Sequence, residues 1–159
     1  MNAKIEICLN RATEAEITGH LYCCDADFIP PLSGRVVISN YARKITEKAT
    51  RFEVWADGAL VGLVAVYYND SEHRVAYITS VSVLRGWQGL GIASKLMERC
   101  IHYAKELSYE RIALEVDRDN VAAIRLYMKK GFMWNGCVDR TVSMHLSTGK
   151  IADCSRNVQ

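Results

Sequence analysis

The sequence predicts an α/β (α+β) fold, a mixed and mostly antiparallel sheet of about six to seven strands with helices on both faces. Three observations predict it. Two β-rich runs flank the turn pair Asp57-Gly58. Apolar residues recur at three-and-four spacing after residue 92, the period of an amphipathic helix. Beyond residue 110 a strand pattern, a helix pattern and two more β runs follow in turn.

The chain has the size and composition of one globular domain. It has 159 residues, half of them hydrophobic and a quarter charged, with only two prolines. We therefore treat residues 1–159 as a single domain.

The N-terminal part is expected to hold one strand and two helices. Residues 4–9 form a short β-like run. A helix is expected from Thr13, which can cap it with Glu16 three residues on. Residues 28–34 contain both prolines and must be a loop, and a second helix is expected from near Ser39.

The middle of the chain reads as a hairpin followed by a third strand and a long helix. Residues 51–70 carry the hairpin, and residues 75–83 continue the sheet. The apolar stripe of the following helix begins near Ala93 and ends near Leu107. One face of this helix should pack on the sheet.

The last third reads as strand, helix, strand, strand. Residues 111–116 form a strand, and Asn120 can cap a helix that ends before Gly131. Residues 132–134 and 141–147 are two short β runs.

Charge and hydropathy argue against several partners. The formal net charge of +2 is small and evenly spread, which does not suggest a nucleic-acid or acidic-membrane surface. There is neither an apolar run of membrane-spanning length nor a signal peptide, so we expect no membrane association and a cytoplasmic location.

Six cysteines and four histidines carry no recognisable metal or disulfide pattern. No CxxC spacing occurs, and we expect reduced, mostly buried thiols. The histidines have no metal-ligand spacing, so no metal site is predicted and none of them is our candidate catalyst. The cysteines are Cys8, Cys23, Cys24, Cys100, Cys137 and Cys154.

A glycine-rich turn lies between the third sheet strand and the long helix. A strand that enters such a turn and then a helix presents several unpaired backbone N–H groups beside the positive end of the helix dipole, which suits a phosphate. The stretch "GWQGLGI" (86–92) fits neither the P-loop nor the Rossmann fingerprint, because Ile92 stands where the P-loop has lysine and the glycines are spaced GxxGxG.

The pattern that fits is Gln/Arg-x-x-Gly-x-Gly/Ala, met by Gln88, Gly91 and Ala93. Here the chain resembles the GNAT superfamily of N-acetyltransferases. A second block, "LEVDRDNVAAIRLYMKKGF" (114–132), is similar to the family's strand, asparagine, helix, tyrosine and Gly-Phe. The resemblance runs from about Phe52 to Leu146. It implies an acetyl-CoA-binding and catalytic core at residues 51–146, with residues 1–50 shaping the substrate site.

The resemblance also implies cofactor contacts. The pyrophosphate of acetyl-CoA would bind the backbone amides from Gln88 to Ala93, and the pantetheine arm would enter where the strands splay. The residues expected to bind acetyl-CoA are Val81, Val83, Gln88, Gly89, Leu90, Gly91, Ile92, Ala93, Asn120 and Tyr127.

Three of these residues have a more specific expected role. The family points to the N–H of Val83 as the donor that polarises the thioester carbonyl. Tyr127 matches the family's general acid, although its position on an apolar helix face also suits core packing. Asn120 matches the asparagine that contacts pantetheine, and a helix N-cap role is equally compatible.

Glu115 is the candidate general base. Alternation along residues 111–116 places it on the face opposite Leu114 and Val116. Its spacing from Tyr127 is similar to that in ribosomal-protein alanine acetyltransferases, where the two residues serve as base and acid. An ion pair with Arg111 or Lys129 is the alternative.

The acceptor is expected to be the primary amine of a small molecule, an amino sugar or metabolite, acetylated by direct transfer. Alternatives are a peptide or protein N-terminus, a non-catalytic CoA-binding module, and a binder of another nucleotide phosphate. The protein is expected to act as a monomer or homodimer. The residues expected to line the acceptor site are Tyr67, Tyr68, Asn69, Tyr77 and Thr79.

Overall fold

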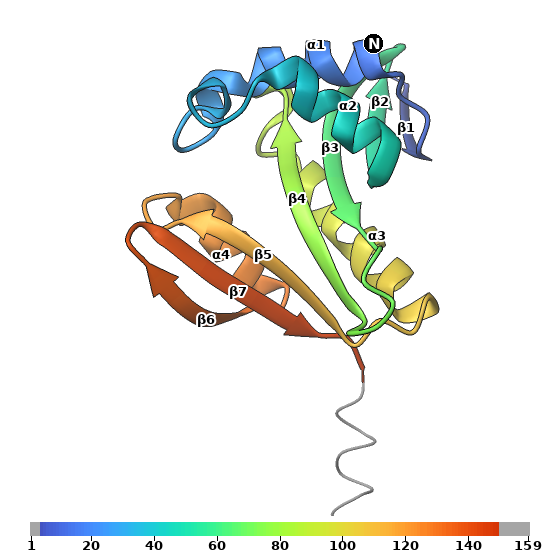
Figure 1. The fold of residues 1–159 in the computed structure, drawn as a ribbon. Helices are drawn as coiled ribbons and strands as arrows, with labels where there is room; N and C mark the ends of the chain where they lie inside the picture. Colours follow the sequence, from blue (N-terminus) through green and yellow to red (C-terminus); the bar gives the residue numbers. More distant parts are fainter. Residues whose placement is uncertain (1–3, 150–159) are drawn as a thin grey trace, which may run out of the picture.

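The computed structural model describes residues 4–149, which form one seven-stranded sheet flanked by four α-helices (Figure 1). The strands are β1 (Ile5–Leu9), β2 (Thr50–Ala56), β3 (Ala59–Tyr67), β4 (Val75–Val83), β5 (Arg111–Asp117), β6 (Met133–Val138) and β7 (Thr141–Ser147). The helices are α1 (Glu14–Cys24), α2 (Ile38–Lys48), α3 (Ile92–Glu106) and α4 (Val121–Lys129). Short 3-10 turns are η1 (Asp25–Asp27), η2 (Leu32–Gly34) and η3 (Arg85–Trp87).

The sheet has the order β1-β2-β3-β4-β5-β7-β6 and contains one parallel pair, β4 with β5. That pair is in register over four positions only, from Val75 opposite Arg111 to Ile78 opposite Leu114. Beyond Ile78 the two strands diverge, and Figure 1 shows them as the arms of a V that meet at the lower end of the sheet. The segment between α1 and α2 projects over the open end of this V.

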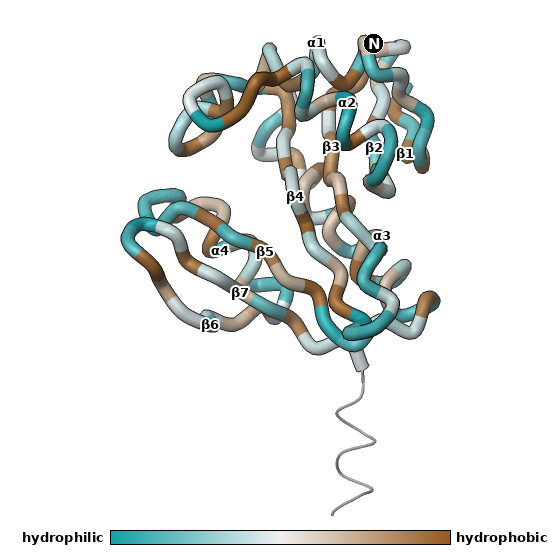
Figure 2. The backbone as a smooth tube through the Cα atoms, in the orientation of Figure 1, coloured by the Kyte–Doolittle hydropathy of each residue, from teal (hydrophilic) through white to brown (hydrophobic). Residues whose placement is uncertain are grey.

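The helices cover both faces of the sheet, as the sequence predicts. Helix α3 and the inner face of α4 pack with one set of strand residues, and α1 and α2 pack with the other set. In Figure 2 the hydrophobic stretches follow the strand centres, and hydrophilic residues gather at the connecting turns. Two apolar cores therefore lie on either side of one sheet.

Several predicted local signals are confirmed. Thr13 and Glu16 form a reciprocal capping box at the start of α1. Asp57 and Gly58 both have positive φ in the β2–β3 turn. Gly131 has φ +102° directly after α4 and its C-cap.

The C-terminal hairpin differs from the prediction at its first strand. Phe132 is not in the strand but is buried in the core, and β6 continues through Val138. An irregularity in the β6–β7 ladder lies between Trp134 and Cys137, where Gly136 adopts φ +130°. Because the stretch "NGCVDR" is polar, the sequence pattern does not indicate that the strand continues into it with a bulge.

A buried carboxylate ties the start of α1 to the sheet, and nothing in the sequence pattern predicts it. Glu53 on β2 is fully buried and accepts the backbone N–H groups of Arg11 and Ala12 at 3.1 Å. The Arg51 guanidinium and the Trp55 indole N–H also bond this carboxylate. The charge is therefore compensated by several donors, as burial requires.

Gly62 on β3 lets the first turn of α3 approach the sheet. A Cβ at this position would lie 2.6 Å from Cγ2 of Ile92, the first residue of the helix. Because Ile92 is branched at Cβ and stiff at χ1, it cannot move away without shifting the start of α3.

Gly62→Ala is expected to destabilise the protein by about 1–3 kcal/mol through overpacking. The measurement is urea unfolding at equilibrium. The matched control is Gly34→Ala, because a Cβ there meets nothing within 4 Å. Equal stability of the Gly62→Ala variant and the wild type would contradict this close approach.

Candidate active site

Three adjoining cavities run along the gap between the diverging strands β4 and β5. We call them the turn-side, central and open cavities, and their volumes are about 110, 100 and 440 Å³. The turn-side and central cavities share Phe28, Val81 and Asn120. The central and open cavities share Ile29, Arg35, Thr79, Glu115, Val116 and Asp117. Because neighbouring cavities share lining residues, the three lie side by side, and we refer to them together as the cleft.

The glycine-rich turn lies at the turn-side end of this cleft. Gly89 and Gly91 have φ of +79° and +80°, and a Cβ at either would meet nothing within 4 Å. The first backbone N–H bonded within α3 is that of Lys95, to Gly91 O at 3.0 Å. Among residues 4–149, the N–H groups from Gly89 to Ser94 have no hydrogen-bond acceptor. These unpaired donors sit at the positive end of a 15-residue helix.

The predicted amide cradle needs one correction. The backbone N–H of Gln88 is already bonded to Arg85 O at 3.3 Å, within η3. The available amides therefore begin at Gly89. Gln88 contributes through its side chain instead, because Nε2 donates to Val83 O at 3.1 Å and to Asp27 Oδ2 at 3.3 Å.

Asp27 links the turn to the segment between α1 and α2. Besides accepting from Gln88, it pairs with the Arg85 guanidinium at 2.5 Å, and this ion pair raises the pKa of Arg85. The sequence analysis did not single out Asp27, because it lies about 60 residues from its partners in the chain. It fixes one wall of the turn-side cavity.

Backbone donors at the end of β4 face the gap. The N–H of Leu84 bonds Val61 O on β3 at 2.9 Å, so strand alternation turns the N–H groups of Val83 and Val81 toward β5. The ladder with β5 ends at Ile78, so no strand partner meets them there. Val83 lines the turn-side cavity, and Val81 lines both that cavity and the central one.

Tyr127 and Asn120, both from the second block of the resemblance, line the central cavity. Tyr127 is 7% exposed, and burial, with a smaller contribution from Cys100, raises the pKa of its phenol. The phenol therefore keeps its proton at neutral pH. Asn120 is the N-cap of α4, accepting the Ala123 N–H at 3.3 Å, and it also lines the turn-side cavity.

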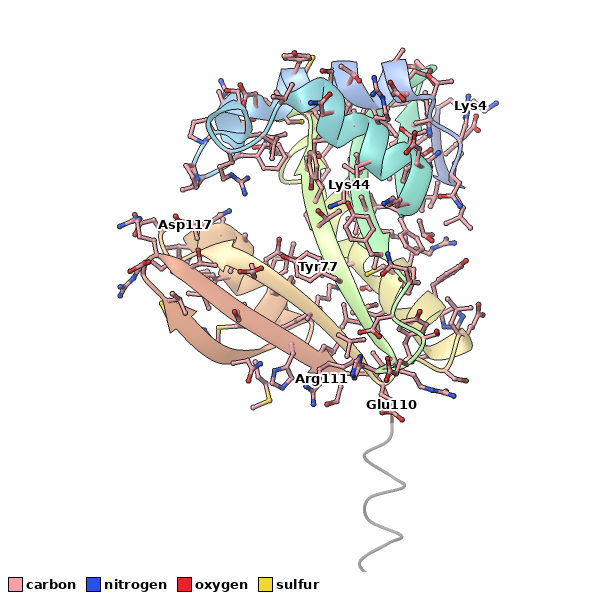
Figure 3. All side chains as sticks on the ribbon, viewed as in Figure 1. Lys4, Lys44, Tyr77, Glu110, Arg111 and Asp117 are labelled. Atoms are coloured by element: carbon pink, nitrogen blue, oxygen red, sulfur yellow. The ribbon has the colours of Figure 1, made fainter. Side chains whose placement is uncertain are left out.

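Glu115 lines the central and open cavities from β5. Its carboxylate accepts a hydrogen bond from the Tyr77 hydroxyl at 2.9 Å. Burial, together with this bond, raises the pKa of Tyr77. Within the described part of the chain, Glu115 forms no ion pair with Arg111 or Lys129. Figure 3 shows Tyr77 in the space between β4 and β5.

Of the five predicted acceptor residues, the structure brings two to the cleft. Tyr77 and Thr79 line the open cavity. Tyr67 is the strand partner of Tyr77, with a buried hydroxyl that bonds none of the described residues.

The other two lie elsewhere. Tyr68 points to the opposite face, where its hydroxyl donates to Cys100 O at 2.8 Å and its ring contacts Tyr103 and Tyr109. Asn69 is exposed in the loop after β3. Side chains alternate along a strand, so adjacent tyrosines cannot both face the cleft.

The sequence analysis missed a bulge that shapes the cleft floor. The β3–β4 ladder shifts between Ala65 and Val66, leaving Thr79 as the extra residue on β4. The Tyr41 hydroxyl, from α2, donates to Thr79 O at 2.6 Å. This contact fixes the bulge to helix α2.

A second missed feature is a buried histidine beside the turn-side cavity. The His20 Nδ1 lies 3.0 Å from Leu60 O, which can only accept, so Nε2 is the acceptor of the Ser82 hydroxyl at 2.9 Å. Burial lowers the pKa of His20, so the ring is neutral at pH 7. Burial also raises the pKa of the neighbouring Cys24 thiol to about 11.

Among residues 4–149 the cysteines are all unpaired, and no cluster of histidine, cysteine and carboxylate side chains could hold a metal ion. Cys154 lies outside the described residues. No helix within this range has the length and apolarity to cross a membrane.

Comparison with known proteins identifies the family. Residues 20–132 match the Acetyltransferase (GNAT) family. The spermine/spermidine N(1)-acetyltransferase of Bacillus subtilis (strain 168) is 32% identical over 82 residues, 51% of this chain and 54% of the relative. The N-alpha-acetyltransferase MAK3 of Arabidopsis thaliana is 31% identical over 83 residues, 52% of this chain and 44% of the relative. The chain thus spans about half the length of the curated relatives it matches.

A solved structure agrees with this match at the level of the fold. The PaiA N-acetyltransferase of Thermoplasma acidophilum, crystallised in complex with coenzyme A, has a TM-score of 0.71 at 15% identity. The similarity covers 91% of this chain and 99% of that one. The family match spans the glycine-rich turn, Glu115, Asn120 and Tyr127. The chain therefore belongs to the acetyltransferase (GNAT) family.

Proposed function

We propose that the protein is an acetyl-CoA-dependent N-acetyltransferase that moves an acetyl group directly to the primary amine of a small molecule. The observation that carries the proposal is a row of adjoining cavities that has Gln88 and the unpaired helix-start amides after it at one end and a buried, protonated tyrosine further in. Phosphate recognition and a proton donor for a leaving thiolate are the two things this reaction needs.

The turn fits the pyrophosphate of acetyl-CoA. Gly89 and Gly91 leave open space where a side chain would otherwise fill the cradle, and six consecutive N–H groups have no other acceptor in residues 4–149. When bound, acetyl-CoA supplies the acetyl group as a thioester. Asn120 and the end of β4 would hold the pantetheine arm, because they line the cavity beside the turn.

Backbone N–H groups on β4 would polarise the thioester carbonyl. The sequence analysis favours Val83, but Val81 is the one that lines the central cavity together with Tyr127. We therefore propose the Val81 N–H as the polarising donor and the Val83 N–H as a contact further toward the turn. A single donor of this kind typically contributes about 3 kcal/mol of transition-state stabilisation.

Proton movements then complete the transfer. A C–N bond forms as the C–S bond breaks, the amine loses a proton and the sulfur gains one. Tyr127 would give the proton to sulfur, since its raised pKa keeps it protonated. Glu115 would accept the amine proton, and its bond from Tyr77 leaves its other oxygen open to an acceptor.

The acceptor side supports a small molecule. The open cavity is about 440 Å³, within the size range of small-molecule sites. Phe28, Ile29 and Arg35 line the cleft, which supports the proposal that residues 1–50 shape specificity and residues 51–146 carry the catalytic core. The cytoplasmic location, the absence of nucleic-acid partners and the monomeric or homodimeric state stay predictions of the sequence.

A peptide N-terminus is the second candidate acceptor. It is supported by the resemblance to Arabidopsis MAK3, named as an N-alpha-acetyltransferase, and by the pairing of Glu115 with Tyr127 in one cavity. We prefer the small-molecule proposal because the segment that contains Ile29 and Pro30 lines the open cavity, in which the acceptor would bind.

Turnover is expected when acetyl-CoA is mixed with a panel of amines and peptides, and release of free thiol measures it. Small amines should give release above the rate without acceptor. Binding of acetyl-CoA with no release on any acceptor would instead indicate a non-catalytic CoA-binding module. Protection from heat by ATP or NAD but not by acetyl-CoA would overturn the proposal entirely.

Tyr127→Phe is expected to lower kcat by roughly 10²- to 10⁴-fold, because the general acid is lost while the ring still fills its place. The Michaelis constant for acetyl-CoA should change little. Tyr22→Phe is the matched control, since Tyr22 is 59% exposed on α1. Unchanged turnover in Tyr127→Phe would leave Tyr127 as a packing residue only.

A further inference from the structure

The charged groups of the central cavity leave one cation and one anion available to a ligand. Its charged lining residues are Arg35, Glu115 and Asp117. Asp117 is committed, since it accepts the Asp119 N–H at 2.8 Å and pairs with Arg140 at 3.6 Å. Arg140 also pairs with Asp119. Arg35 and Glu115 therefore remain to bind an acceptor.

Arg35 is held at the cleft by its backbone. It follows η2, and its N–H bonds Leu32 O at 2.9 Å. Its side chain forms no ion pair or hydrogen bond with the residues from 4 to 149. Arg35 lines the central and open cavities together with Thr79, whose carbonyl oxygen accepts the Tyr41 hydroxyl.

Glu115 lines the same cavity as Arg35 but comes from a different element. It lies on β5, whereas Arg35 comes from the segment between η2 and α2 that spans the open end of the V. Both residues line the central cavity with Tyr127, and both line the open cavity. A carboxylate and a guanidinium that line one cavity of about 100 Å³ match an amine and a carboxylate carried close together on one molecule.

The open cavity would take the rest of that molecule. It is lined by Ile29, Pro30 and Tyr77, which give apolar surface, and in Figure 3 Tyr77 lies between the arms of the V, with Asp117 toward the far end of β5.

Building on the proposed function, we propose that the acceptor is a free amino acid. Its carboxylate binds the Arg35 guanidinium, its amine lies at Glu115 within reach of Tyr127, and its side chain occupies the open cavity. Arg35 is then a specificity-determining residue. The N-terminal part of the chain binds the carboxylate of the acceptor, and residues 51–146 carry out the acetyl transfer.

Matched acceptor triplets test this proposal. Each of the amino acids that carry a primary α-amine is compared, by thiol release from acetyl-CoA, with its carboxamide and with its decarboxylated amine, and spermidine and glucosamine are added. At least one amino acid should exceed its amide and its amine by roughly tenfold or more in kcat/KM, since both lose the charged contact.

Arg35→Gln should lower kcat/KM for that amino acid by roughly 10- to 100-fold, mainly through KM, and should change turnover of the matched amine less than about twofold. Arg43→Gln is the control, because Arg43 lies on α2, 59% exposed and paired with Glu14, outside the cleft. That variant should behave as the wild type with every acceptor.

Three results would overturn the proposal. One is amides or simple amines reacting as well as the amino acids, and another is Arg35→Gln losing activity equally with all acceptors. The third is turnover of spermidine or glucosamine with no turnover of any amino acid. These results leave the proposed acetyltransferase function standing, whereas no thiol release above the acceptor-free rate with any acceptor would remove both proposals.

Discussion

The short parallel pairing of β4 with β5 is the constraint on which the site depends. Four residue pairs join the strands, and the ladder then stops although both strands continue. Where the strands diverge, β4 presents backbone donors that have no strand partner, and β5 presents Glu115 from its open face. If the β4–β5 ladder continued to the ends of both strands, it would satisfy those donors and close the cleft.

Contacts from outside the sheet keep the divergence open and ordered. Gln88 bonds Val83 O and Asp27, and Arg85 pairs with Asp27, so the end of β4, the glycine-rich turn and the segment after α1 are linked. On the opposite side of the cleft floor, Tyr41 holds the Thr79 bulge. The N-terminal part of the chain therefore fixes the position of β4, the strand whose end carries the proposed polarising N–H groups.

Much of the fold could be predicted from local signals. The capping box at Thr13, the Asp57-Gly58 turn and the helix stop at Gly131 each follow from backbone preferences of a few neighbouring residues. The glycine turn and Tyr127 could be found because their motifs lie in contiguous stretches. Alternation also placed Glu115 on the open face of β5, where the structure has it.

What sequence reasoning missed depends on contacts between distant segments. Asp27, Tyr41 and Arg35 lie in the part of the chain with the weakest motif signal, and each acquires its role from a strand or turn far away in sequence. Tyr68 was grouped with Tyr67 by residue type, although strand alternation sends them to opposite faces. The burial of Glu53 could not be anticipated, since two of its donors are backbone N–H groups of the distant residues Arg11 and Ala12.

The central claim is that unpaired amides from Gly89 to Ser94 bind a diphosphate while the end of β4 binds the arm attached to it. The most direct measurement is the change in backbone amide chemical shifts of ¹⁵N-labelled protein on titration with coenzyme A and, separately, with pantetheine, which lacks the phosphates. Coenzyme A should shift the amides of Gly89–Ser94 together with Val81 and Val83, and pantetheine should affect the β4 amides alone. Coenzyme A shifts concentrated on any other surface, with the glycine turn unmoved, would contradict the claim.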